Sequence, residues 1–274
     1  MSEMEPGYTY GQENPFPAAG SVYLVKVGRR ECYRTPHGDM KRTTNVLRAL
    51  GLKTEGLVRW SASVEREAMI AAAAEVFAGG QAEDVQSFID LIWASLPAVK
   101  EGERRKTEAG DLGTSAHDEI RRRTLLMLGA PAPAEMPLRI EAAHAVEAWE
   151  RWMHDEQITP FLAEQPVYHA PSMTAGTIDL LAYDRHGRLG IPDYKTSKAI
   201  YPDHHVQVAH YCRMARQWAP IEWASIVRLP KNVNDEAFEV VPLGHLDSKR
   251  TLTEEELHEV FDAANRVYDL LMAA

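Results

Sequence analysis

The chain has little cysteine and no long apolar run. Only two of its 274 residues are cysteines, Cys32 and Cys212, and they lie far apart in the sequence. Two cysteines exclude a four-cysteine site within this chain, whether for zinc or for an iron–sulfur cluster, and they indicate a reduced, cytoplasmic protein. No stretch reaches the roughly 18 apolar residues of a membrane-spanning helix. The acidic, polar N-terminus lacks the pattern of a signal peptide, so we expect no membrane association.

Positive charge is scarce overall but unevenly placed. The formal net charge is −10, which taken alone argues against nucleic acid as a partner. Residues 184–231, however, contain eight Lys or Arg against four Asp or Glu, whereas residues 232–274 contain three against ten. A phosphate backbone responds to a local basic patch more than to the global sum. The central segment is therefore compatible with a polyanionic partner, and equally with an ordinary solvated surface.

The hydrophobic periodicity changes along the chain and separates a helical half from a mixed half. Helical spacing predicts helices over residues 61–78, 84–96, 115–128 and 138–154. Alternation and turn residues predict a small hairpin over residues 22–34, strands over 166–168, 174–183 and 188–194, and a second hairpin over 223–229 and 237–241. Two more helices are predicted. One covers residues 204–217, and the other begins at a capping box at Thr253 and ends at about Met272.

One predicted hairpin places two carboxylates together. Residues 184–187 read Asp-Arg-His-Gly and are turn formers. If the turn centres on His186, Asp179 faces Asp193 across an antiparallel pair, and like charges so placed are destabilising. A divalent cation held by carboxylate oxygens is the simplest way to neutralise them. The alternative is a different register, with one or both acids in solvent.

Lys195 lies two residues after Asp193 and therefore projects from the same face of the strand. An amine beside two acids and a cation suits a reaction in which negative charge builds on a phosphate. The alternative is an exposed ion pair between Asp193 and Lys195, which stabilises little. Pro192 cannot donate a ladder hydrogen bond, which indicates a distorted strand next to the acid.

Two predicted helices offer further candidates. His117 lies on or beside a mostly apolar helical face, where it is either a core histidine or a third metal ligand. Gln207 and Tyr211 are spaced i and i+4 and share a face. That spacing fits ordinary amphipathicity, and it also fits an amide and a phenol directed at the site.

Four short motifs, in this order, resemble the PD-(D/E)xK nuclease superfamily. They are Gly-Thr-Ser-Ala-His at 113–117, Gly-Thr-Ile-Asp-Leu-Leu at 176–181, Asp-Tyr-Lys-Thr-Ser-Lys at 193–198 and Gln-Val-Ala-His-Tyr at 207–211. They look most like the RecB-type exonuclease branch. The resemblance covers about residues 113–230 and implies an α/β, restriction-endonuclease-like core, with a central mixed β-sheet flanked by helices and a helical N-terminal half before it.

The resemblance also implies an organisation and a set of roles. We predict a mostly helical region with a small hairpin at residues 1–112, the nuclease core at 113–245 and an acidic C-terminal helix at 246–274, all in one compact domain. The implied ligands of Mg²⁺ or Mn²⁺ are His117, Asp179, Asp193 and the backbone carbonyl of Tyr194, with Glu164 as a candidate additional acid. The implied catalytic residues are Lys195, Asp179 and Asp193, and the implied substrate-binding residues are Gln207, Tyr211, Thr196 and Lys198.

The implied function is that of a metal-dependent DNA exonuclease in phage-type recombination, repair or DNA processing. Several relatives in this branch carry a four-cysteine iron–sulfur cluster, so this chain is nearer the cluster-free phage enzymes. DNA is the expected partner, and a recombination protein is a candidate second partner. A structure-specific endonuclease, a nuclease acting on RNA and a non-catalytic DNA-binding module stay open as alternatives. Residues 121–123, three consecutive arginines, are either a strip for the phosphate backbone or a solvated helix face. The oligomeric state is left open.

Overall fold

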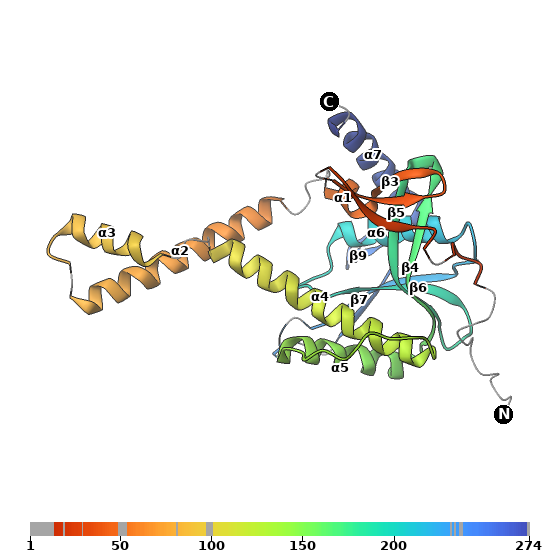
Figure 1. The fold of residues 1–274 in the computed structure, drawn as a ribbon, viewed down its shortest axis with the longest axis horizontal. Helices are drawn as coiled ribbons and strands as arrows, with labels where there is room; N and C mark the ends of the chain where they lie inside the picture. The colour runs from red at the N-terminus through yellow and green to blue at the C-terminus, as the bar shows by residue number, and fades with distance from the viewer. Residues whose placement is uncertain are drawn as a thin grey trace. The chain divides into compact units, whose positions relative to one another are not determined.

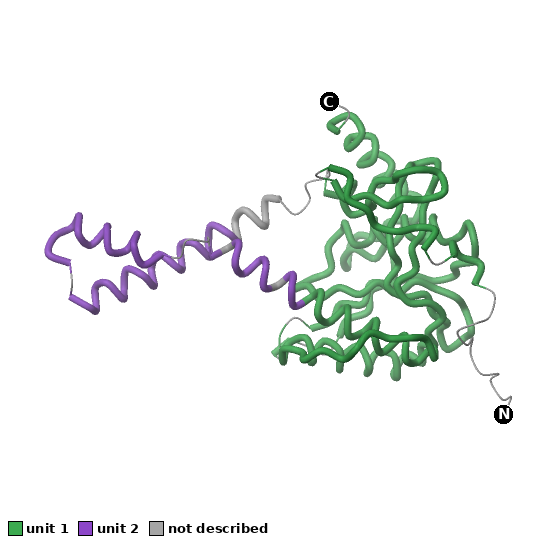
Figure 2. The backbone as a smooth tube through the Cα atoms, in the orientation of Figure 1, with its two compact units in different colours: residues 1–50, 113–274 green, residues 51–112 purple. Residues whose placement is uncertain are grey.

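A computed structural model describes most of the chain and divides it into two units. It describes residues 14–18, 20–28, 30–48, 54–80, 82–96, 101–230, 232, 234–235 and 238–272, with the side chains of 54–60, 102 and 109 excepted. Residues 1–50 and 113–274 form unit 1, and residues 51–112 form unit 2 (Figure 2). The boundary expected after residue 112 coincides with the end of unit 2. Residues 1–50, which the sequence groups with the helical region, belong to unit 1.

Unit 1 is an α/β unit built on a mixed sheet of eight strands (Figure 1). The strands are β1 (Tyr23–Val27), β2 (Arg30–Thr35), β3 (Gly38–Arg42), β4 (Thr159–His169), β5 (Thr174–Tyr183), β6 (Leu189–Lys195), β7 (Trp223–Arg228) and β8 (Glu239–Pro242). The helices are α1 (Thr43–Arg48), the part of α4 (Glu101–Met127) from Gly113 onward, α5 (Ile140–Asp155), the 3₁₀ turn η1 (Ala170–Ser172), α6 (Pro202–Ala215) and α7 (Glu254–Met272). Two short strands, β9 (His245–Asp247) and β10 (Arg250–Thr251), form a separate ribbon.

Helices cover both faces of the sheet. On β6, Ile191 joins a buried cluster with α6 residues such as Val208 and Met214. The ring of Tyr194 instead lies 5.8 Å from that of Trp152 on α5 and makes contact with α4 as well. Residues three apart on a strand point to opposite faces, so α6 packs on one face while α4 and α5 pack on the other. This layering confirms the predicted central mixed sheet with flanking helices.

The strand pairing contains a gap beside β5. Along one edge, β5 pairs with β4 over its whole length. Along the other edge it pairs with β3 only at Thr174 and Ala175 and with β6 only at Ala182 and Tyr183. Among the described residues, positions 176–181 therefore have no strand partner on that edge. Strand β6 continues beside β7 in parallel instead.

The N-terminal strands belong to this sheet. The predicted hairpin is confirmed as β1 and β2, but a third strand, β3, follows and pairs in parallel with β5. Tyr33 and Met40 are buried together with Ala175 of β5. The apolar contact, rather than any local pattern, adds the N-terminal strands to the core.

The predicted helices and strands are largely confirmed, with three differences in length. Helix α2 begins at Thr54 rather than at residue 61. Helix α4 begins at Glu101 rather than near Ser115. Its first turns were not predicted because they carry ion pairs, such as Glu101 with Arg104 and Arg105, instead of an apolar stripe. Strand β4 begins at Thr159 rather than near Pro166. Its alternation is interrupted by a register shift after residue 160 and by the positive φ of Glu164, 50°.

Unit 2 is helical. It contains α2 (Thr54–Gly79), α3 (Val85–Ser95) and the part of α4 up to Leu112. Asp84 caps α3 and forms a reciprocal capping box with Ser87. No helix in the described part of the chain is both long enough and apolar enough to cross a membrane.

Candidate active site at the gap between two strands

The turn that joins β5 and β6 has the predicted centre. The Asp184 carboxylate accepts hydrogen bonds from the amides of His186 and Arg188, both at 2.9 Å. Gly187 takes a φ of 73°, a conformation that favours glycine. The register next to the turn pairs Tyr183 with Leu189, as a centre at His186 requires. The predicted hairpin register is therefore confirmed at its closed end.

Farther from the turn the two strands separate. Their ladder ends after the pair Ala182 and Gly190, so Asp179 and Asp193 are not ladder partners. Pro192 has no amide proton with which to continue the ladder. Instead, the Asp179 side chain crosses the gap, and its Oδ2 accepts a hydrogen bond of 3.2 Å from the amide of Tyr194. The carboxylate thus takes the place of a backbone acceptor on the open edge of β5.

Asp193 and Lys195 form an ion pair in which Asp193 is buried and Lys195 is half-buried. Only 1% of Asp193 is exposed, and its Oδ2 lies against Lys195 Nζ. Burial raises the pKa of Asp193, an effect that Lys195 opposes and Asp179 reinforces. Burial alone lowers the pKa of Lys195, but the charges of Asp193 and Asp179 outweigh it and raise the pKa. The pair is therefore not the exposed ion pair that the sequence left open.

Glu164 is brought next to these acids. Its neighbours Ala163 and Gln165 pair with Leu180 and Ile178, so Glu164 lies across β4 and β5 from Asp179. Burial, with the negative charge of Asp179 adding to it, raises the pKa of Glu164 to about 7. The site therefore gathers three carboxylates whose mutual repulsion a cation would relieve.

His117 approaches the same group from α4. Its Nδ1 lies 3.8 Å from Asp179 Oδ2, and its side chain is 27% exposed. Gly113, one turn earlier, lets α4 come close to β6: a Cβ there would lie 2.8 Å from Thr196 Oγ1. His117 is thus a half-exposed neighbour of the carboxylates rather than a buried core histidine.

Gln207 and Tyr211 share a face of α6, as their spacing predicts. The Gln207 side-chain amide donates a hydrogen bond of 2.9 Å to the Tyr211 hydroxyl. Tyr211 is buried, and its ring lies directly over Gly176: a Cβ there would be 2.6 Å from Tyr211 Cε1. This contact explains the glycine in the motif. It also indicates that Tyr211 supports β5, while half-buried Gln207 is the member of the pair nearer to solvent.

The remaining predicted residues lie around the site with different exposures. Thr196 is half-buried and Lys198 is exposed just after β6. The amide of Tyr194 contacts Asp179, and its side chain packs against Trp149 and Trp152. A role for the carbonyl of Tyr194 as a ligand stays a prediction.

The three arginines at 121–123 do not form a uniform strip. Arg122 and Arg123 both donate hydrogen bonds of 2.7 Å to the buried Glu119 carboxylate, and Arg123 also pairs with Glu150 on α5. Arg121 is exposed, and its charge lowers the pKa of Glu164 against the effect of burial. Only Arg121 therefore faces the site.

The sequence reasoning missed Tyr33. Its hydroxyl lies 2.8 Å from Thr177 Oγ1, on the open edge of β5 two residues before Asp179. Burial raises the pKa of Tyr33, and the charges of Glu164 and Asp179 add to that rise. No local signal marks Tyr33, because it reaches the site only through the pairing of β3 with β5.

The donor set fits a hard divalent cation, although its oxygens are engaged by other groups. Among the described residues, no three His, Cys, Asp or Glu side chains are arranged to hold an ion as they stand. Lys195 occupies Asp193 Oδ2, and the Tyr194 amide occupies Asp179 Oδ2. Buried Asp193, with Asp179 and Glu164 beside it, supplies carboxylate oxygens, which are the donors that Mg²⁺ and Mn²⁺ prefer.

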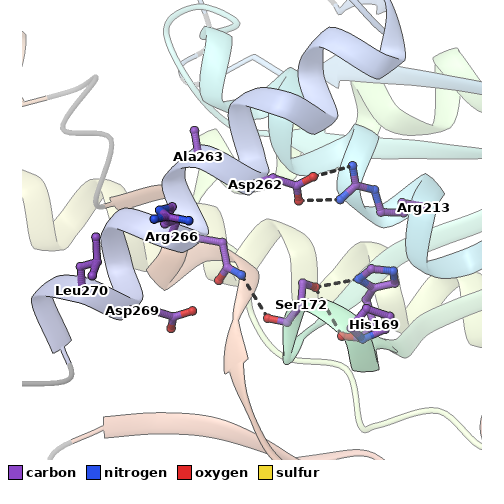
Figure 3. A pocket seen from close by; sticks show the side chains of 10 residues that line it. His169, Ser172, Arg213, Asp262, Ala263, Arg266, Asp269 and Leu270 are labelled. Atoms are coloured by element: carbon purple, nitrogen blue, oxygen red, sulfur yellow. Dashed lines mark hydrogen bonds and ion pairs between the residues drawn. The ribbon is translucent and has the colours of Figure 1, made fainter.

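A second polar region lies at the other end of β5 and has a different character. An open hollow of about 950 Å³ is lined by His169, Ser172, Arg213, Asp262, Arg266 and Asp269, among others (Figure 3). Arg213 binds Asp262 through two hydrogen bonds of 2.7 and 3.2 Å, and Asp269 pairs with Lys41. The two carboxylates are exposed, and Arg213 and Lys41 neutralise them. The hollow lacks a buried carboxylate group, so we place the candidate active site at the gap in the sheet.

A comparison of the chain with protein-family models finds no match, and a comparison with curated proteins finds none either. The resemblance to a nuclease superfamily thus rests on the four motifs and stays a prediction.

Proposed function

We propose that the protein is a metal-dependent nuclease acting on DNA, with a restriction-endonuclease-like core, and that it acts as an exonuclease. The observation that carries the proposal is the ion pair of buried Asp193 with half-buried Lys195, which lies beside Asp179 at a gap between two strands. Burying a charged pair has a large desolvation cost. The fold could have placed apolar residues there, so the pair indicates chemistry rather than stability.

Each residue of the site has a role in this proposal. Asp179 and Asp193, with His117 and Glu164 at the margin, would hold Mg²⁺ or Mn²⁺. The ion would supply a Lewis acid that polarises a phosphate oxygen and acidifies water. Lys195 is an ammonium held at the carboxylates, so it contributes positive charge where the phosphate becomes more negative. Asp193 holds the Lys195 ammonium in place at the site.

Exposed cations near the site support DNA as the substrate. Lys198 follows β6 directly, and Arg121 lies one helical turn after His117 on α4. Six of the eight Lys and Arg residues of the segment 184–231 form ion pairs with acids of this chain, so the attraction of a polyanion would come from Lys198 and Arg121.

The first experiment separates the proposed activity from its alternatives. Linear and covalently closed circular duplexes are incubated with the protein and Mg²⁺ or Mn²⁺, with EDTA as control. Loss of linear DNA alone supports the exonuclease, whereas nicking of the circle indicates an endonuclease. Binding without cleavage, measured by gel shift, indicates a DNA-binding module. Cleavage of RNA but not of DNA contradicts the proposed substrate.

Variants then assign the activity to the site. Asp179→Asn should lower cleavage by about 100-fold or more, since a charged group of the site is lost. Asp262→Asn is the matched control, because Asp262 is an exposed aspartate paired with Arg213 at the other hollow. Equal loss in both variants, or near-normal activity in Asp179→Asn, would show that the site is wrongly assigned.

A further inference from the structure

Helix α3 of unit 2 exposes an apolar stripe. Val85, Ile89 and Trp93 are 76%, 39% and 63% exposed. They are spaced four residues apart and so lie on one face of the helix, about 12 Å long. The half-buried apolar residues of α3, Phe88, Leu91 and Ile92, lie on other positions of the helix. The helix is therefore apolar on two sides, and packing within unit 2 accounts for only one of them.

Helix α2 exposes large apolar residues as well. Ile70 and Phe77 are 63% and 81% exposed, and their spacing of seven places them on one face. Single exposed apolar side chains are common on protein surfaces, but several on neighbouring helices indicate an interaction site. We call the three exposed residues of α3, Val85, Ile89 and Trp93, the hairpin stripe.

The charge around the hairpin stripe has one sign. Residues 67–99 contain five Asp or Glu and no Lys or Arg. Among the described residues, no ion pair reaches Glu75, Glu83 or Asp90; Asp90 accepts only a hydrogen bond from Gln86. An acidic rim repels nucleic acid and anionic lipid. It equally disfavours a second copy of the same stripe, because two such rims would face each other.

We propose that the hairpin stripe is a docking surface for an amphipathic helix of another protein, one with apolar residues on its inner face and Lys or Arg at its edges. Helices recognised in this way insert an apolar face, and complementary charge at the rim sets orientation and association rate. The proposal does not depend on the nuclease activity. It concerns unit 2 alone, in which residues 67–99 carry only acidic charge.

The test uses the full chain and a defined probe. The probe is a fluorescein-labelled 18-residue peptide with leucine at helical core positions and lysine elsewhere. Its control has glutamate in place of every lysine. Fluorescence anisotropy should show that the lysine peptide binds and that the glutamate peptide binds at least ten-fold more weakly. Added salt should weaken the binding of the lysine peptide.

Two variants locate the binding. Ile89→Ser/Trp93→Ser should raise the Kd of the lysine peptide at least ten-fold with unchanged helix content by circular dichroism. The matched control is Met136→Ser/Ile140→Ser, which removes two apolar side chains of unit 1 that are 69% and 70% exposed and should leave the Kd unchanged. Glu75→Gln/Glu83→Gln/Asp90→Asn should weaken binding several-fold and flatten its dependence on salt.

Other occupants give distinguishable results, and each would overturn the proposal. Binding that persists in Ile89→Ser/Trp93→Ser places the peptide elsewhere. Equal binding of the glutamate peptide removes the role of charge. Sedimentation that shows a dimer, lost only in this variant, assigns the stripe to a second copy. Binding to phosphatidylcholine vesicles that depends on Trp93 assigns it to lipid.

Discussion

The two units depart from the usual distribution of side chains in opposite directions. At the gap beside β5, unit 1 buries charge: Asp193 is 1% exposed. On α2 and α3, unit 2 exposes apolar surface: Phe77 is 81% exposed. Buried polar groups and exposed apolar patches are the informative exceptions in a folded chain. Each is unfavourable by itself, so each marks a place where a further interaction matters.

The units differ in where that interaction comes from. In unit 1 the buried carboxylates have partners within the chain, because Lys195 pairs with Asp193 and the Tyr194 amide binds Asp179. In unit 2 the stripe on α3 has no described partner of its own. A site whose groups are held in place before the substrate arrives suits catalysis. A stripe without a partner suits association.

The largest effect is expected from breaking the pair of Asp193 and Lys195. Lys195→Met leaves Asp193 buried without its partner, which should cost about 3–5 kcal/mol of unfolding free energy and lower cleavage by at least ~100-fold. Adding Asp193→Asn should restore most of the stability but none of the activity. Urea unfolding and a DNA cleavage assay measure the two. Arg34→Met, which breaks the exposed pair with Asp39, is the control and should change little. If the double variant recovered cleavage activity, the Asp193–Lys195 pair would not be required for catalysis.

A comparison of two phenylalanines sharpens the contrast between the units. Phe261 is fully buried and stacks on His210 with the ring centroids 3.6 Å apart. Phe261→Ala should therefore cost about 3–5 kcal/mol of unfolding free energy. Phe77→Ala should change it by less than ~0.5 kcal/mol, because the side chain contributes little to the core. Similar losses in both variants would mean that Phe77 is packed against the rest of unit 2 rather than exposed.

Two glycines allow a tightly packed position of unit 1 to be compared with an open position of unit 2. Gly176→Ala should cost about 1–3 kcal/mol, since its Cβ would overlap the Tyr211 ring. Gly110→Ala on α4 should instead stabilise by about 0.5–1 kcal/mol, because no atom lies within 4 Å of the new Cβ and the helix interior favours alanine. Adding Tyr211→Phe to Gly176→Ala should not restore stability, because the nearest atom is Cε1 rather than the hydroxyl. Thermal unfolding of the four proteins measures these differences.

The smallest effect is a dependence of unit 1 on pH. Burial, with the charge of His245 adding to it, lowers the pKa of His205 to about 4. The unprotonated His205 Nδ1 accepts a hydrogen bond of 3.1 Å from the Gly244 amide, which protonation would break. The unfolded chain binds the proton more readily, so this stability is present above pH ~6.5 and is lost as the pH falls toward 4.

The variant that checks this effect is His205→Asn, compared with wild type by urea unfolding between pH 4.5 and 7.5. It should flatten the pH dependence by on the order of 1 kcal/mol. His154→Asn is the control, because His154 is a solvent-exposed histidine at the end of α5 and should leave the slope unchanged. An unaltered slope in His205→Asn would show that other groups carry the dependence.

Most of the helices and strands could be predicted from the sequence. The turn of residues 184–187 and the strands beside it carry strong local signals, and their register next to the turn follows from them. The first half of α4 was missed because ion pairs replace the apolar periodicity there. Strand β4 was predicted too short because its proline residues and the positive φ of Glu164 interrupt the alternation.

The candidate site was predictable only in part. Asp193 and Lys195 were expected to share a strand face, and they form an ion pair. The apolar strand neighbours Ile178, Leu180 and Ile191 indicate partial burial of the acids, but the nearly complete burial of Asp193 depends on helices packed over both faces of the sheet. The separation of β5 from β6 was also hidden, and it determines that Asp179 meets the Tyr194 amide rather than Asp193.

The sequence by itself determined most of the helices and strands, where the hairpin turns, and which acids and amine lie near one another along the chain. These features depend on neighbours within a few residues, whose geometry the backbone period sets. The tertiary structure alone decided that β3 joins β5 and brings Tyr33 to Thr177, that Asp193 is almost completely buried beside Lys195, and that α3 exposes a second apolar face. Those outcomes depend on contacts between residues far apart in the sequence, which no local pattern specifies.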